Sequence, residues 1–274
     1  MEIKDTRLLV LCKTYPFPSA KYTETSCVAV MTEDGSLLRI YPVPFRLINS
    51  TQQFKKWQWM IAKIQKTTND HRPESHRIYV DTINCEDKAI PTKNGWRDRR
   101  FWLDKLTLFT DFVELETTRQ QEGITLGLLK PASLCGLDIT PVKNPDWTKD
   151  EEEKLLHEQR QGNLFEPNIE AKSLKQLRKL PYDFHYRYEC ETPMGLKIYR
   201  HKIVDWEAGA LYWNICRDKN WETKFRQRYE QEFAEKDLMF LMGTIHRFPS
   251  QWLIISVIYP PKPPVEVEEQ LSLF

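Results

Sequence analysis

The stretch Thr25-Ser26-Cys27-Val28-Ala29-Val30-Met31 decides the fold that we predict from the sequence. It is an apolar run of strand length, and Asp34-Gly35 follows it, a pair that is typical of the tight turn of a β-hairpin. Residues 36–41 form the predicted return strand. Further runs of strand length lie at 7–12, 57–65 and 76–80. Short strands at this spacing predict a small barrel or a strongly bent sheet.

Helical spacing interrupts these strands in the middle of the chain. Residues 96–108 and 111–121 carry apolar side chains at helical intervals, with Thr110 or Asp111 as the predicted N-cap and Gly123 as the predicted stop. Strand patterns return at 124–129 and 136–141. From residue 182 onward, alternation places four aromatic side chains on one strand face: Tyr182, Phe184, Tyr186 and Tyr188. We therefore predict an α+β protein with two small β-barrel-like units and inserted helices.

Changes in composition divide the chain into four parts. Residues 1–145 form the predicted N-terminal β-rich unit with inserted helices, and 146–172 a charged helix and linker that opens at the capping box Thr148-Lys149-Asp150-Glu151. Residues 173–260 form the predicted C-terminal β-rich unit with two helices. Prolines dominate the start of the last part, 261–274, and such a segment resists helix and sheet. We expect it to be a flexible tail.

The composition excludes several classes of protein. The net charge is +1, so any nucleic-acid surface must come from local clustering of basic residues. No apolar run has the length of a membrane span, and the N-terminus has no signal-peptide layout. We expect a cytoplasmic, nucleoid-associated protein without membrane contact. The six cysteines include no C-x-x-C pair, and no phosphate-binding glycine loop occurs, so we predict no metal and no cofactor.

The last five residues carry the most specific pattern, Gln270-Leu271-Ser272-Leu273-Phe274. They resemble the peptide with which bacterial DNA polymerases and mismatch-repair proteins bind the ring-shaped sliding clamp. In that family the glutamine hydrogen-bonds at the rim of a pocket, and the second leucine and the phenylalanine fill it. The resemblance implies that the bacterial DNA sliding clamp is a partner. The alternative is that this tail packs on the protein's own core. An imperfect copy of the pattern, which lacks the first leucine, occurs at 161–165.

The body of the chain resembles a bacterial family described as carrying two OB-like barrels and linked to conflict with phages and mobile elements. The resemblance rests on 26–30 with the hairpin 38–43, and on Cys190, His201, Asp205-Trp206-Glu207, 240–244 and 252–255. The chain departs from the family at Val30, where a glycine is frequent. The resemblance implies two OB-like units that bind nucleic acid or a nucleotide. It does not by itself imply catalysis.

Basic and aromatic side chains gather around the first predicted strands. Small barrels bind single strands by stacking bases on aromatic rings while Lys and Arg neutralise phosphates. The alternative is ordinary strand packing with solvated charges, and the sequence leaves both open. Phe45 is a further aromatic residue of this stretch. The predicted nucleic-acid-binding set is Lys13, Tyr15, Lys21, Tyr22, Arg39, Tyr41, Arg46, Lys55, Lys56, Trp57 and Arg72.

Three other groups have chemical potential but a simpler structural interpretation. The loop 70–76 concentrates titratable residues and is interpreted as a charged surface turn. Cys190 and His201 are two potential metal ligands on paired strands, but a zinc site needs three or four. A basic cluster near the first helix is interpreted as a salt-bridged helix face; it comprises Arg97, Arg99, Arg100 and Lys105.

We predict a nucleic-acid-binding adaptor that is recruited to the sliding clamp, in DNA repair or in conflict with phages and mobile elements. The alternative is a metal-dependent nuclease at the replication fork, with Asp205, Glu207 and Lys202 as catalytic residues, because two carboxylates and a lysine can hold Mg²⁺ and a water. Helix capping by Asp205 explains the same residues without catalysis. A third hypothesis is an interaction subunit of a defence operon without nucleic-acid contact. The choice between DNA and RNA stays open.

Overall fold

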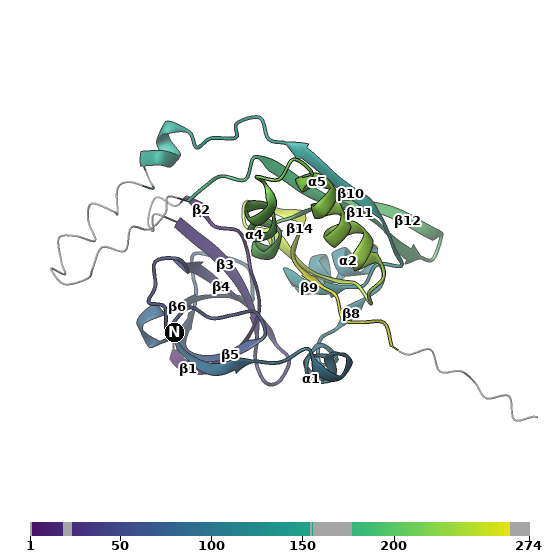
Figure 1. Ribbon diagram of the computed structural model, residues 1–274. Helices are drawn as coiled ribbons and strands as arrows, with labels where there is room; N and C mark the ends of the chain where they lie inside the picture. Colours follow the sequence, from purple (N-terminus) through teal and green to yellow (C-terminus); the bar gives the residue numbers. More distant parts are fainter. Residues whose placement is uncertain (1, 19–23, 154, 156–176, 264–274) are drawn as a thin grey trace, which may run out of the picture.

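The computed structural model describes residues 2–18, 24–153, 155 and 177–263, which form two sheets with accompanying helices (Figure 1). The first sheet contains β1 (Ile3–Lys13), β2 (Phe17–Pro18), β3 (Glu24–Met31), β4 (Leu37–Val43), β5 (Gln58–Lys66), β6 (Ser75–Ile78) and β7 (Asn84–Ala89). The second contains β8 (Leu108–Phe109), β9 (Leu126–Leu129), β10 (Ser133–Pro141), β11 (Tyr182–Thr192), β12 (Gly195–Ile203), β13 (Met239–Ile245) and β14 (Phe248–Ile258). The labelled helices of the described residues are η1 (Val80–Thr82), α1 (Lys93–Leu103), α2 (Phe112–Glu122), α4 (Trp206–Ile215), α5 (Trp221–Arg226) and η3 (Gln227–Glu232), the last a π-helix; residues 149–153 are helical as well.

The first sheet closes into a five-stranded barrel. Its strands pair in the order β1-β3-β4-β6-β5, and β5 pairs back with β1 from Ile3↔Gln65 to Leu9↔Trp59. The β4–β6 pair is parallel and the other barrel pairs are antiparallel. A closed five-stranded barrel of this kind is OB-like. The predicted OB-like barrel is therefore confirmed for the N-terminal half.

Strand β1 is apolar at every position from Leu8 to Cys12 because both of its faces are covered. Alternate residues point to opposite sides of a strand. Leu8 and Val10 lie in the barrel interior, whereas Leu9 and Leu11 join a second cluster that contains residues of both sheets. In that shared cluster Leu9 and Met31 of the barrel lie with Leu128 and Leu241 of the second sheet. The two sheets thus share one apolar core.

The second sheet stays open. Its order is β10-β11-β12-β14-β13-β9-β8, with parallel β12–β14 and β8–β9 pairs, and its outer strands β10 and β8 do not pair with each other in the described structure. The prediction of a second barrel is therefore wrong. Three of the four aromatic residues predicted on one face of β11 are buried, and helices cover that face: the rings of Phe184 and Phe225 stack with centres 4.4 Å apart. Figure 1 shows α4 and α5 beside this sheet.

Several local predictions are confirmed. The side chain of Asp111 accepts a hydrogen bond from the Val113 N–H (2.8 Å), and Gly123 ends α2 with a φ of 78°. The capping box at Thr148 forms, since its N–H donates to Glu151 Oε2 (2.8 Å).

The pairing of strands β8 to β10 differs from the predicted division of the chain. We placed these strands in the N-terminal unit, but they pair in the second sheet. The predicted linker beyond residue 155 and the clamp-binding tail lie outside the described residues.

Candidate nucleic-acid interface

A cavity of about 810 Å³ lies against the β3–β4 face of the barrel, and we name it the β3–β4 cleft. On the barrel side it is bordered by Thr14, Phe17 and Pro18, at the start of the β1–β3 connection, and by residues between β5 and β6. On the other side are the end of β12 and the β13–β14 hairpin, including Gly243 and Ile255. In OB-folds, this strand face and the corresponding two loops bind oligonucleotides and oligosaccharides.

The charged residues that line the β3–β4 cleft are predominantly basic. Five Lys and Arg residues line it against one carboxylate, that of Asp70; they are Arg39, Arg72, Arg77, Lys202 and Arg247. Arg72 is paired with Asp70 (2.6 Å) and Lys202 with Asp183 (2.6 Å). Arg77 and Arg247 are exposed, and neither forms an ion pair within the described part of the chain. The cleft therefore has a local positive potential that the net charge of the chain conceals.

Arg39 is the most deeply placed of these cations. Its side chain is 3% exposed; it donates from Nη2 to the Thr125 carbonyl (3.0 Å) and from Nη1 to Cys27 Sγ (3.4 Å). Its Nε has no hydrogen-bond partner among the described residues. The carboxylate of Glu74 accepts from Thr125 Oγ1 (2.7 Å) and forms no ion pair with Arg39. A buried guanidinium without a carboxylate partner is costly, and an anion in the cleft would offset that cost.

Two exposed rings also line the β3–β4 cleft. Tyr41 is 45% exposed and Phe17 is 53% exposed, and neither packs on another aromatic ring within the described residues. Exposed aromatic rings beside basic residues are the stacking platforms of single-strand-binding proteins. The structure thus brings together Arg39, Tyr41 and Arg72 from the predicted nucleic-acid-binding set.

Other members of that set lie away from the cleft, at the junction of the two sheets. The ammonium of Lys13 lies 3.4 Å from the ring centre of Phe45 and 4.8 Å from that of Trp206. Burial lowers the pKa of Lys13 to about 8. Tyr15 donates from its hydroxyl to the Arg178 carbonyl (2.7 Å) and accepts from Trp213 Nε1 (2.8 Å). Both side chains are engaged in internal contacts.

The remaining members of the set are dispersed. Trp57 is 2% exposed in the shared core, and Arg46 pairs with Glu24 (3.2 Å). Lys55 is exposed but does not line the cleft. Lys21 and Tyr22 lie outside the described residues.

The structure gives the predicted nuclease residues a structural role. Asp205 is the N-cap of α4: its Oδ1 accepts from the Glu207 N–H (3.0 Å) and its Oδ2 from the Val257 N–H (3.0 Å). Lys56, not Lys202, lies beside these carboxylates, 2.8 Å from Glu207 and 3.7 Å from Asp205. Burial alone would lower the pKa of Lys56, but the two carboxylates outweigh burial and raise it. An ammonium therefore neutralises the pair that we considered for Mg²⁺.

The basic cluster of α1 is engaged mainly in contacts within the protein. Arg100 pairs with Asp237 (2.9 Å), Arg97 pairs with Asp98 (3.3 Å), and Arg99 lies over the ring of Trp96 (4.6 Å).

The potential metal ligands Cys190 and His201 have packing roles. Cys190 is fully buried, and His201 lies 2.8 Å from the Tyr188 hydroxyl and against the ring of Phe112. Their surroundings offer no further ligand among the described residues.

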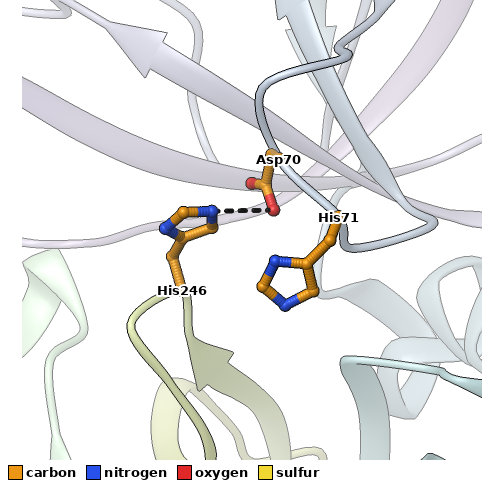
Figure 2. Close-up of side chains that lie close together, drawn as sticks. All are labelled: Asp70, His71 and His246. Carbon is orange, nitrogen blue, oxygen red and sulfur yellow. Dashed lines mark ion pairs between the residues drawn. The ribbon is translucent and has the colours of Figure 1, made fainter.

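Sequence reasoning missed one constellation. At the rim of the cleft, the potential metal-ligand atoms of Asp70, His71 and His246 lie within 4.8 Å of one another (Figure 2). We predicted a charged surface turn for the first two residues and no metal. The third residue comes from the β13–β14 turn, far away in the sequence, so that no ligand spacing could reveal the group.

Comparison with protein families divides the chain between two models. Residues 109–274 match the model described as "Domain of unknown function (DUF8757)", and residues 4–105 match "Domain of unknown function (DUF8758)". The chain belongs to the DUF8757 family. In this DUF8757 member the longer match covers the second sheet and its helices, and the shorter match covers the barrel and α1.

No curated protein matches this DUF8757 member. A solved structure, "Structure and Conformational Change of a Replication Protein A Heterotrimer Bound to ssDNA", is similar over 94% of the chain at 9% identity and a TM-score of 0.23. The match covers 66% of that structure's chain, just under two thirds. A TM-score this low supports no conclusion about fold or function, so the assignment of the barrel rests on strand pairing alone. No helix in the described ranges is long and apolar enough to cross a membrane.

Proposed function

We propose that this protein binds a short stretch of single-stranded nucleic acid, or a nucleotide, in the β3–β4 cleft. The observation that carries the proposal is the combination of an OB-like strand face, five Lys and Arg against one carboxylate, and exposed rings in one cavity. Each feature alone is common on protein surfaces. Together they match the way in which small barrels hold single strands.

The geometry supports a division of labour within the cleft. Arg77 and Arg247 are exposed and form no ion pair in the described structure, so they are suited to neutralise phosphates. The rings of Tyr41 and Phe17 offer faces on which bases stack, a contact worth about 1–3 kcal/mol per base. Arg39 is held in place by Thr125 and Cys27 and provides a fixed positive charge at the base of the site.

The size of the cleft favours a short ligand. A volume of about 810 Å³ is within the range of small-molecule sites, roughly 300–1,000 Å³. The β13–β14 hairpin borders the cleft opposite the barrel, and Arg72 Nη1 donates to the Thr244 carbonyl (2.9 Å) across the two sheets. The cleft is therefore bordered on both sides, and we expect it to contact only a few nucleotides.

We further propose that the tail 270–274 recruits this binding unit to the bacterial sliding clamp. This part of the proposal rests on the sequence resemblance, since the tail lies outside the described residues. Recruitment to replicating DNA would suit a role in repair or in conflict with phages and mobile elements. We favour an adaptor over a nuclease because Asp205 and Glu207 serve α4 and Lys56.

Binding of the full chain to fluorescent oligothymidylates and oligouridylates of increasing length, and to nucleotides, tests the cleft. We expect affinity to stop increasing after a few nucleotides and to decrease with salt, with a logarithmic slope of about −0.7 for each phosphate neutralised. Arg247→Ala should weaken binding and reduce that slope. Arg97→Ala, which removes an exposed arginine on α1, is the matched control and should change neither. Absence of binding to all these ligands at low salt would refute the proposal.

Binding to purified sliding clamp tests the tail separately. A chain with Leu273→Ala and Phe274→Ala should lose a roughly micromolar complex, about 8 kcal/mol of binding free energy. The same variant should bind oligonucleotides like the unmodified chain. Equal clamp affinity in both chains would show that the tail is not the tether.

A further inference from the structure

Two loops from different sheets bring two imidazoles and a carboxylate together at the rim of the β3–β4 cleft. Asp70 and His71 lie between β5 and β6, and His246 lies in the turn between β13 and β14. Figure 2 shows the carboxylate of Asp70 close to both rings. Both histidines are exposed, whereas Asp70 is partly buried. The group is distinct from the cations and rings that we propose for nucleic-acid binding.

The ligand atoms of this group lie within 4.8 Å of one another, and the Asp70–His246 distance is close to that of two ligands on one ion. His246 Nε2 lies 3.6 Å from Asp70 Oδ1, longer than an N–H···O hydrogen bond of about 2.7–3.2 Å. In a tetrahedral zinc site with bonds of about 2.1 Å, two ligand atoms lie about 3.4 Å apart. The ring centres of His71 and His246 are 5.1 Å apart. Two imidazoles on one such ion have centres roughly 5 Å apart.

The carboxylate of Asp70 is held in one orientation by hydrogen bonds from Arg72 and Ser75. The short bonds reach Oδ2, from Arg72 Nη2 (2.6 Å) and Ser75 Oγ (2.7 Å). Oδ1 carries the longer bonds, from Arg72 Nε (2.9 Å) and the Arg72 N–H (3.1 Å). Oδ1 also faces His246, so it is the oxygen offered to an ion.

The same arginine also sets the distance between the two loops. Arg72 Nη1 donates to the carbonyl of Thr244, two residues before His246, while the rest of its guanidinium holds Asp70. Partners of this kind, which orient a ligand without contacting the ion, contribute strongly to metal affinity. The two halves of the group are thus aligned before any ion binds.

From this geometry we infer that Asp70 Oδ1, His71 and His246 bind a transition-metal ion, with Zn²⁺ the ion that fits best. Two imidazoles and one carboxylate favour zinc and neighbouring first-row metals over Mg²⁺ and Ca²⁺, which prefer oxygen ligands. Three protein ligands leave a fourth position for water or another ligand. Because Asp70 and His246 both line the cleft, that position is accessible from it.

Titration of the full, metal-free chain with Zn²⁺ by calorimetry, and with Co²⁺ by visible absorption, tests the site without nucleic acid, so its outcome is independent of the proposed function. We expect one equivalent to bind, with the absorption bands of four-coordinate Co²⁺. His71→Ala and His246→Ala should each weaken binding on the order of tenfold or more. Zn²⁺ should raise the unfolding temperature of the unmodified chain and not of these variants.

His76→Ala is the matched control, because His76 lies near the same loop but its Nδ1 is 2.9 Å from the Glu74 carbonyl, outside the group. It should bind Zn²⁺ like the unmodified chain. Circular dichroism of the metal-free variants should be unchanged, since both substituted ligands are exposed. The chain has six cysteines, and a near-ultraviolet thiolate band with Co²⁺ would reveal binding there instead. The inference would be overturned if the chain showed no saturable Zn²⁺ binding or bound the ion through thiolates alone. It would also be overturned if His71→Ala and His246→Ala bound Zn²⁺ with the affinity of the unmodified chain.

Discussion

The same residue types occur in different surroundings at two places in the molecule, the β3–β4 cleft and the junction of the two sheets. At the β3–β4 cleft, Arg77 and Arg247 lack ion-pair partners in the described structure, and Tyr41 is 45% exposed. At the junction with the second sheet, Lys13 lies among aromatic rings and Lys56 between carboxylates. The difference is what covers each face. Residue type alone therefore does not identify a candidate binding surface, because the start of α4 covers one face and leaves the other accessible.

The largest expected effect is a loss of unfolding free energy on the covered face, at the junction of the two sheets. Asp205→Ala removes the N-cap of α4, leaves the Val257 N–H without its acceptor, and takes one of two carboxylates from the buried Lys56. Breaking a buried ion pair on one side costs about 3–5 kcal/mol. We expect urea unfolding to show a loss of this size, while the folded fraction keeps its oligonucleotide affinity.

Glu207→Gln provides the comparison within the same cluster, because the Glu207 side chain is 44% exposed. Its loss should cost less than about 1 kcal/mol. If Asp205→Ala left stability intact and abolished a Mg²⁺-dependent cleavage instead, the nuclease alternative would be correct.

The next largest effect is expected in the pH dependence of the free energy of unfolding, and it comes from His201 on β12. Lys202 lines the cleft, whereas His201 is largely buried against Phe112 and Tyr188. Burial, aided by His185, lowers the pKa of His201 to about 4. The unfolded chain, with a pKa near 6.5, then binds a proton that the folded chain does not. This contribution to stability is complete above about pH 6.5 and is lost as the pH decreases to about 4, a total of roughly 3 kcal/mol.

Unfolding free energies across this pH range check the assignment. His201→Gln should give a flatter curve between pH 6.5 and 4 than the unmodified chain, whatever its stability at neutral pH. Parallel curves would mean that His201 is not the group that titrates.

A smaller effect is expected for the exposed ring of the cleft. Tyr41→Ala should lose roughly 1–3 kcal/mol of binding free energy for single-stranded nucleic acid, whereas Tyr41→Phe should retain it, because stacking needs only the ring. Tyr15→Phe is the counterpart on the covered face. It loses the hydrogen bond to Arg178 and should reduce stability without changing binding. Fluorescence anisotropy together with urea unfolding distinguishes the two results.

The smallest effect is expected for Lys13→Met. Replacing a buried charge with an apolar side chain of similar length is often neutral or stabilising, so we expect a stability change within about 1 kcal/mol. Oligonucleotide affinity and its salt dependence should not change, because Lys13 does not line the cleft. A reduced salt slope in this variant would show that the covered face contacts phosphates after all.

Local features of the fold were predictable because their causes are local. The turn at Asp34-Gly35, the cap at Asp111 and the stop at Gly123 depend on residues only a few positions apart. Strand spacing also predicted the barrel. The prediction of a second barrel was wrong because the alternation of Phe184, Tyr186 and Tyr188 reveals a buried face but not which elements cover it. A closed barrel and a sheet covered by helices bury the same pattern.

The candidate site was predictable only in part. Arg39 and Tyr41 were found because they lie on the hairpin that the sequence identifies most clearly. Lys13 and Lys56 were assigned to the same surface, since the unbroken apolar run of β1 indicates that both of its faces are covered but not that the cover extends to these two lysines. The contact between His71 and His246 depends on how the two sheets are aligned, which no sequence spacing encodes.

Leu9, Met31, Leu128 and Leu241 form a core between the two sheets, and this core affects how the two segments of the chain evolve. The two family matches meet between residues 105 and 109, yet each segment covers apolar surface of the other. A recombination event that separated them would expose this surface in both products. Genes that encode one segment should therefore carry the other as well. Substitutions at these four positions should be correlated across the boundary, as in two subunits that have coevolved for a long time.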